Sequence, residues 1–122
     1  ALSASSRQTP IISLYCHLQE YAEENGLRDD LAGLCALATA CLHKLYEGKG
    51  TIVIASIDKW DVDHIWYELG DKKIDLTSGQ FGSHTIQYRI LQRTSNIEDL
   101  IEFCKDWDDA ELPIEENVNK VL

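Results

Sequence analysis

The sequence predicts an α+β fold in which a central buried helix packs on a small antiparallel sheet. Two helical patterns come first, a group of β-branched segments follows them, and another helical pattern comes after the strands. Strands that are grouped together, instead of alternating with helices, are typical of an antiparallel sheet in an α+β domain. The chain has 122 residues, which suits a single domain over residues 1–122.

The first two helices are predicted from apolar spacing and end signals. A Thr-Pro pair at the start and an Asn-Gly pair at the end assign the first helix to residues 9–26, with residues 1–8 frayed before it. The second helix is expected to begin near residues 29–30 and to run to Tyr46. Its apolar residues cover nearly the whole circumference, which is typical of a helix buried on most sides.

Four segments after these helices have the composition of strands. Residues 51–55 form a short β-branched run that suits a buried strand, and residues 61–69 and 72–76 form a hairpin around Gly70-Asp71. Residues 84–92 show alternating character and predict a further strand.

The C-terminal part is predicted to be helical and then acidic. Ser95 or Asn96 is expected to cap a helix that runs through Trp107. The acidic tail over residues 108–122 either docks as a helix or stays loose.

The charge disfavours two classes of partner. The chain has 11 Lys and Arg against 21 Asp and Glu, a formal net charge of −10. Such a chain does not suit a phosphate backbone or an anionic lipid surface, and no apolar run approaches the roughly 20 residues that span a bilayer. We therefore expect no nucleic-acid partner and no membrane partner.

The sulfur-containing residues indicate where the protein works. Three of the four cysteines (Cys16, Cys35 and Cys41, but not Cys104) lie in strongly apolar helical stretches, where a thiol behaves as a small hydrophobe. A reducing compartment such as the cytoplasm is therefore favoured over a pair of disulfides. There is no methionine, so either an initiator Met has been removed or the chain comes from a longer precursor, and we expect the second.

The predicted hairpin brings a histidine and an aspartate together. A turn at Gly70-Asp71 pairs Trp66 with Asp75, so that His64 and Asp75 become diagonal neighbours on one face, at roughly 7 Å. A carboxylate there can fix the tautomer of the imidazole, as the base of a nucleophilic enzyme requires.

Two cysteines of the central helix are candidates for the nucleophile. Gly33 allows close backbone approach just before Cys35, and a helix that begins near Gly33 would point its amide dipoles at the Cys35 sulfur. Cys41 lies deeper and is expected to be inert. We therefore expect the Cys35 sulfur to meet the His64 imidazole of the neighbouring strands.

A family resemblance agrees with this set of residues. The stretch HIWYELGDKKIDLTSGQF, residues 64–81, resembles the His and Asp strands of papain-like and transglutaminase-like cysteine enzymes, and LAGLC, residues 31–35, resembles the start of their catalytic helix. The frequent Trp after the cysteine is Ala36 here. The resemblance implies a papain-like or transglutaminase-like fold, with Cys35 as nucleophile and a supporting His-Asp pair.

The resemblance also implies a class of reaction. Small bacterial toxin and effector domains that resemble this superfamily include protein glutamine deamidases. The implied activity is that of a cysteine-dependent hydrolase or acyl transferase acting on an amide bond: a deamidase, transglutaminase or peptidase. A protein or peptide would be the substrate, no cofactor would be needed, and the location would be the cytoplasm or the cytosol of a target cell.

Further residues are candidates for supporting roles. The backbone N–H of Cys35 would stabilise the oxyanion, with Gln19 or Gln80 as a second donor. Gln80 alternatively closes the turn after the Asp strand. Trp66 is expected to shield the base or to serve as a core aromatic.

Two other functions are compatible with the sequence. Cys16-His17 and Cys41-x-His43 pair metal-ligand types, but side chains one or two residues apart on a helix point apart, so we expect no metal. The alternative to an enzyme is a non-enzymatic acidic binding module, such as an immunity or inhibitor protein or an inactive relative of the enzymes. A cognate inhibitor or immunity protein is likewise a candidate partner of the enzyme.

Overall fold

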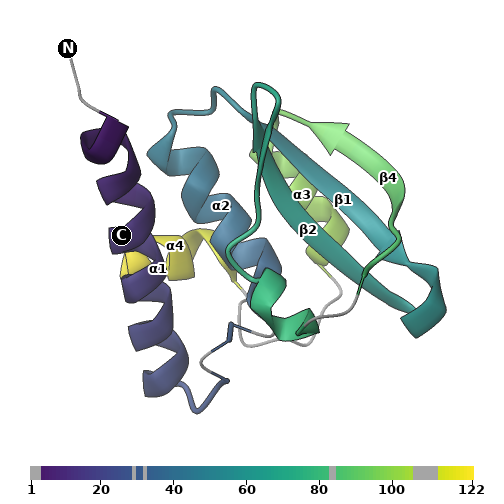
Figure 1. Ribbon diagram of the computed structural model, residues 1–122, viewed down its shortest axis with the longest axis horizontal. Helices are drawn as coiled ribbons and strands as arrows, with labels where there is room; N and C mark the ends of the chain where they lie inside the picture. The colour runs from purple at the N-terminus through teal and green to yellow at the C-terminus, as the bar shows by residue number, and fades with distance from the viewer. Residues whose placement is uncertain (1–3, 29, 32, 83–84, 106–112) are drawn as a thin grey trace.

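The computed structural model describes residues 4–28, 30–31, 33–82, 85–105 and 113–122, and it confirms an α+β fold. Helices α1 (Ala4–Glu24) and α2 (Cys35–Leu45) come before the strands, and α3 (Ile97–Cys104) and α4 (Ile114–Val121) come after them. The strands are β1 (Thr51–Ile57), β2 (Val62–Leu69), β3 (Lys72–Ile74) and β4 (Arg89–Thr94). They form one antiparallel sheet in the order β3-β2-β1-β4 (Figure 1).

The predicted hairpin and its register are confirmed. Tyr67 pairs with Ile74, and the next two pairs follow in the order expected for a turn at Gly70. The return strand β3 is shorter than predicted, because the chain turns at Asp75. Its carboxylate accepts hydrogen bonds from both the N–H and the hydroxyl of Thr77, which replaces ladder pairing with a local turn.

The last strand begins later than the predicted residues 84–92. β3 and β4 lie at opposite edges of the sheet, so the chain between them must cross from one edge to the other. Residues 85–88 belong to that crossing and not to a strand, while residues 83–84 lie outside the described part of the chain. Alternation in this segment therefore predicted a strand where the topology needs a connection.

Two predicted helix starts are wrong. α1 begins at Ala4, so Pro10 lies inside the helix, where it offers no N–H to the preceding turn, and residues 4–8 are helical instead of frayed. α2 begins at Cys35 and not at residues 29–30, because Leu31 (φ 65°) and Gly33 (φ 83°) take left-handed conformations that a helix cannot contain.

The helices after the sheet agree better with the sequence. The Asn96 side chain accepts the N–H of Glu98, as expected of an N-cap, although α3 ends at Cys104 instead of Trp107. In the acidic tail, α4 docks through the buried Ile114, Val118 and Val121. Residues 106–112, which carry several of the acidic side chains, lie outside the described part.

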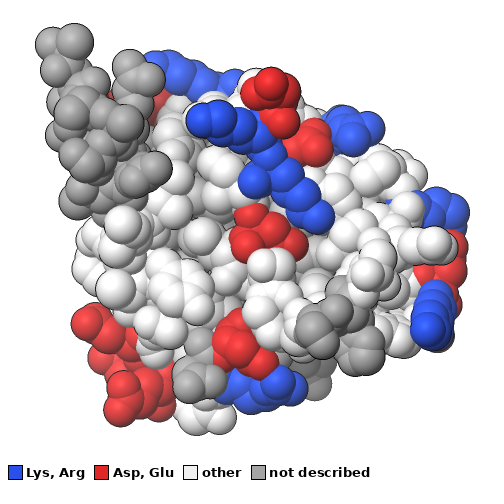
Figure 2. All heavy atoms as spheres, in the orientation of Figure 1, with Lys and Arg blue, Asp and Glu red and all other residues white. Residues whose placement is uncertain are grey.

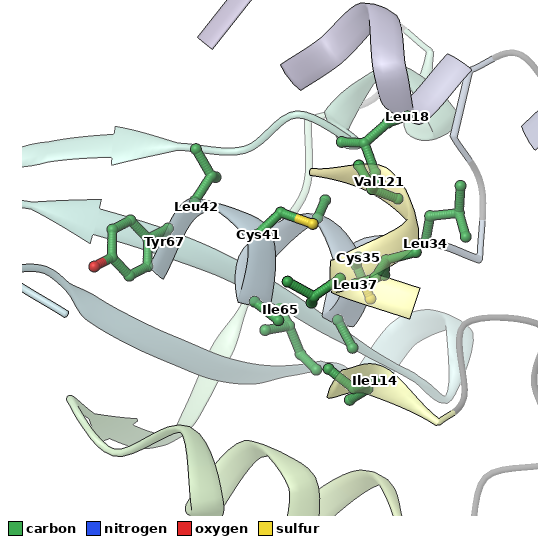
Figure 3. Packing of buried hydrophobic residues seen from close by; sticks show 14 of the residues in the cluster. Leu18, Leu34, Cys35, Leu37, Cys41, Leu42, Ile65, Tyr67, Ile114 and Val121 are labelled. Atoms are coloured by element: carbon green, nitrogen blue, oxygen red, sulfur yellow. The ribbon is translucent and has the colours of Figure 1, made fainter. Parts of the chain in front are cut away.

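The helices pack against one face of the sheet, with α2 at the centre. Nine of the eleven residues of α2 are buried, which confirms that it is the central buried helix. Its cluster takes members from every other helix and from alternate residues of the two central strands (Figures 1 and 3); the strand members are Ile52, Ile54, Ile65 and Tyr67. On the other face, a second small cluster contains Val53, Ala55 and Trp66, with Tyr88 packed against it.

Candidate functional site

The structure joins His64 and Asp75 in a buried pair. Nε2 of His64 lies 2.7 Å from Oδ2 of Asp75, and the two side chains are 1% and 7% exposed. The other carboxylate oxygen accepts from Thr77, at 3.1 Å from its N–H and 3.2 Å from its hydroxyl. With the carboxylate held from both sides, the N–H of the imidazole is directed to Nε2 and a lone pair remains on Nδ1.

Aromatic rings surround the imidazole. Phe81 approaches it edge-on at 4.8 Å between ring centroids, Tyr88 stacks on it at 5.9 Å, and Trp66 lies at 6.1 Å. Trp66 therefore lies beside the histidine, as the sequence suggested. The rings exclude water from the His-Asp pair, which strengthens its electrostatic attraction.

Tyr88 and Thr77 are members of this group that sequence reasoning missed. Burial raises the pKa of the Tyr88 phenol, and the negative charge of Asp75 raises it further. Thr77 is 1% exposed and supplies both donors that anchor Asp75. The Asp-Leu-Thr order was the available signal for Thr77, since Thr two residues after Asp is a common turn arrangement. The position of Tyr88 depends on the crossing of the sheet and had no local signal.

Cys35 is the first residue of α2, but it lies on the other side of the sheet from the His64 side chain. Cys35 is 7% exposed and belongs to the main core cluster, which the helices form with one face of the sheet (Figure 3). Ile65 belongs to that same cluster, so alternation along β2 directs His64 to the opposite face. The expectation that β2 presents His64 to the helix is therefore wrong. Among the described residues, Nδ1 of His64 has no hydrogen-bond partner.

Strand pairing on the β3 side of β2 does not extend to His64. β3 pairs only with Tyr67, Glu68 and Leu69, so no strand is hydrogen-bonded to that edge of β2 at the level of His64. The C-terminal end of α2 lies beside Tyr67, where His43 contacts the Tyr67 hydroxyl, so Cys35 is at the other end of the helix.

The second cysteine of the helix has a structural environment. Cys41 is fully buried, and burial raises the pKa of its thiol to about 12. Figure 3 shows its sulfur directed toward Leu18 and Val121. A thiol of this kind is not ionised at neutral pH and is a poor nucleophile.

The two candidate oxyanion donors have other contacts. Nε2 of Gln80 donates to the Thr77 carbonyl at 2.9 Å, which is the turn-closing contact weighed from the sequence. Gln19 lines a surface cavity on α1 together with Cys16 and Leu27.

A cavity of about 480 Å³ adjoins the aromatic group. It is lined by two segments, residues 57–60 and 85–89. Tyr88 forms one wall and also stacks on His64, while Trp60 forms another and packs on Phe81 at 5.6 Å. The volume lies in the range of small-molecule and peptide side-chain pockets.

The part of the chain that the structure describes contains neither a metal-binding cluster nor a membrane-spanning helix. No group of three or more His, Cys, Asp or Glu side chains there is arranged to hold a metal ion. No helix there is both long and apolar enough to cross a bilayer. The four cysteines are thiols and form no disulfide.

Comparison with known proteins gives no identification. No protein-family model matches the chain, and neither a curated protein nor a solved structure matches it significantly.

Proposed function

We propose that the protein is a cysteine-dependent hydrolase or acyl transferase that acts on an amide bond, with Cys35 as nucleophile, His64 as general base and Asp75 as its orienting carboxylate. The observation that carries the proposal is the buried 2.7 Å contact between Nε2 of His64 and Asp75. A histidine fixed at one nitrogen by a carboxylate, with the other nitrogen open, has the arrangement that a thiol nucleophile requires.

The reaction would follow the usual course of thiol acyl transfer. His64 takes the thiol proton through Nδ1, and the Cys35 sulfur attacks the carbonyl carbon of the amide. The C–N bond then breaks, the proton passes to the leaving nitrogen, and an acyl thioester remains. Water releases a carboxylate, which amounts to deamidation when the substrate is a glutamine side chain, whereas an amine as acceptor gives a new amide.

The position of Cys35 supports the proposal in one respect and opposes it in another. As the first residue of α2, it lies at the positive end of the helix dipole, which stabilises a thiolate. Its burial on the helix side of the sheet opposes direct contact with His64. The proposal therefore requires the thiol and the imidazole to come together from opposite faces of the sheet.

That same burial favours a second candidate, a non-catalytic acidic binding domain. If the sulfur serves only as a core residue, the His64–Asp75 pair stabilises the crossing segment, and the net charge of −10 steers a basic partner. Acidic side chains gather at the lower left of Figure 2, where α1 ends in Figure 1.

Mass spectrometry distinguishes the two functions. Candidate proteins are incubated with the chain and with its Cys35→Ala variant, and intact masses are compared. A gain of about one dalton for each modified site indicates deamidation, fragments indicate a peptidase, and crosslinked species indicate a transferase. Each of these must disappear with Cys35→Ala and persist with Cys41→Ala. Modification that survives Cys35→Ala contradicts the proposal.

A further inference from the structure

The ammonium group of Lys73 lies near the His64–Asp75 pair. It lies on β3 two residues before Asp75, so the two side chains share a face of the sheet. Nζ of Lys73 lies 4.3 Å from the ring centroid of Trp66 and 4.5 Å from that of Tyr88. Both rings also contact His64. Trp66 and Tyr88 therefore lie between the ammonium group and His64, the candidate base, and contact both.

The carboxylates nearest to Lys73 in the sheet are already engaged. Glu68, its cross-strand partner, pairs with Nε of Arg93 at 3.2 Å and lies 3.4 Å from the indole N–H of Trp66. Both oxygens of Asp75 are used by His64 and Thr77. Among the described residues, Lys73 forms no ion pair.

This arrangement differs from that of an ordinary surface lysine. Contact with two aromatic faces restricts the long side chain and keeps the ammonium group in place without neutralising it. The hydrogen-bond donors of the ammonium then remain for an anion that approaches the exposed side of β3. On the face seen in Figure 2, basic side chains lie among acidic ones, although the chain as a whole is acidic.

We infer that Lys73 is a specificity-determining residue that binds a carboxylate of the substrate, so that the enzyme takes amide substrates with an acidic group near the scissile carbonyl. This inference rests on the proposed function. Lys73 would bind the carboxylate, and the rings of Trp66 and Tyr88 would hold Lys73 in place. His64, on the other side of these rings, would act as the general base.

The test compares two neutral-backbone probes that differ only in one side chain. N-acetyl-glutamate α-methylamide carries a carboxylate, and N-acetyl-glutamine α-methylamide carries the isosteric amide. Binding is measured by NMR on the full chain carrying Cys35→Ala, which prevents turnover, and is followed by the indole N–H signal of Trp66. We expect the carboxylate probe to bind about tenfold more tightly, the effect of one charged hydrogen bond.

Matched variants show which cation is responsible. Lys73→Met should remove the preference for the carboxylate, and Lys73→Arg should retain it. Arg93→Met is the control, since it removes the same charge from the same sheet, but from a residue already paired with Glu68. A preference that survives Lys73→Met, or that is lost equally with Arg93→Met, overturns the inference. Spectra of each variant establish folding, and Lys73→Gln repeats the test if Lys73→Met does not fold.

The outcomes separate the two proposals. Binding needs no thiol chemistry, so selective binding in a chain without Cys35-dependent activity supports the carboxylate site and contradicts the enzyme. Cys35-dependent activity without carboxylate preference supports the enzyme and overturns the role of Lys73.

Discussion

The backbone N–H of Gly50 donates a hydrogen bond to the phenol oxygen of Tyr67 at 2.8 Å. The approach is so close that a β-carbon at residue 50 would lie 2.5 Å from the Tyr67 ring. The Tyr67 hydroxyl also contacts Nδ1 of His43 on α2 at 3.1 Å. One phenol thus ties the start of β1 to β2 and to the central helix.

Gly50→Ala should destabilise the protein by about 2 kcal/mol, because the added methyl overpacks a buried contact that cannot move without breaking this network. Urea unfolding followed by circular dichroism measures the loss. Gly79→Ala is the control, since a β-carbon there would meet, among the described residues, only Asp30 at 4.0 Å, and it should change stability by less than about 0.5 kcal/mol. Equal effects of the two substitutions would contradict the role of the Tyr67 contact.

The same network predicts a pH dependence of stability. Burial lowers the pKa of His43, with a smaller opposing contribution from a hydrogen bond to the Ser95 backbone. The unfolded chain therefore takes up this proton at a higher pH than the folded chain. The contribution of His43 is fully present above its unfolded pKa of about 6.5 and is lost as pH falls through that value toward the folded pKa.

Urea midpoints between pH 5 and pH 8 measure this dependence. His43→Gln should be less stable at pH 8 and should lose less stability on acidification than the parent, because glutamine does not titrate. A variant with the full slope of the parent would assign the dependence to other groups.

Asp75→Asn should reduce Cys35-dependent turnover by about 10³-fold or more while the sheet stays folded. An amide can keep the contacts to Thr77 through its oxygen, but it presents its N–H₂ group to His64. The imidazole then accepts at Nε2 and carries its proton on Nδ1, where it can no longer act as a base. The kcat at several pH values and the circular dichroism spectrum are compared with those of the parent. Full activity in a folded Asp75→Asn variant would remove the aspartate from the mechanism.

Alkylation rates of the thiols test the environment of Cys35. Cys16 is exposed and should react at a rate typical of a free thiol, whereas Cys41, with a pKa of about 12, should stay unmodified until the chain unfolds. If Cys35 is a nucleophile, it should react with iodoacetamide ahead of Cys16 in mildly acidic buffer. Peptide mapping after short exposure assigns the label. A Cys35 that reacts as slowly as Cys41 favours the binding domain.

Local patterns in the sequence were enough for the hairpin and for the His64–Asp75 pair. The two residues are eleven apart in the sequence. A turn at Gly70 fixes the register of the hairpin, and because side chains alternate between faces, this register places both residues on the same face. The cap at Asn96 was readable for the same reason, since a cap depends on contacts within three residues.

Helix starts were less readable, because the backbone conformations that decide them depend on packing. The left-handed conformation of Leu31 is uncommon for a branched residue, and its side chain is fully buried in the core. Tertiary contacts stabilise that conformation, so the sequence alone placed the start of α2 too early.

The sequence by itself determined which residues of β2 share a face, but only the tertiary structure decided which face the helices cover. His64, Ile65, Trp66 and Tyr67 are all buried, so both faces of this strand are covered and alternation of polarity could not distinguish them. The helices pack on Ile65 and Tyr67, while the crossing between β3 and β4 brings Phe81 and Tyr88 onto His64. The physical reason is that pairing within a hairpin is a short-range property of the chain, whereas the choice of face is made by the burial of apolar surface from distant segments.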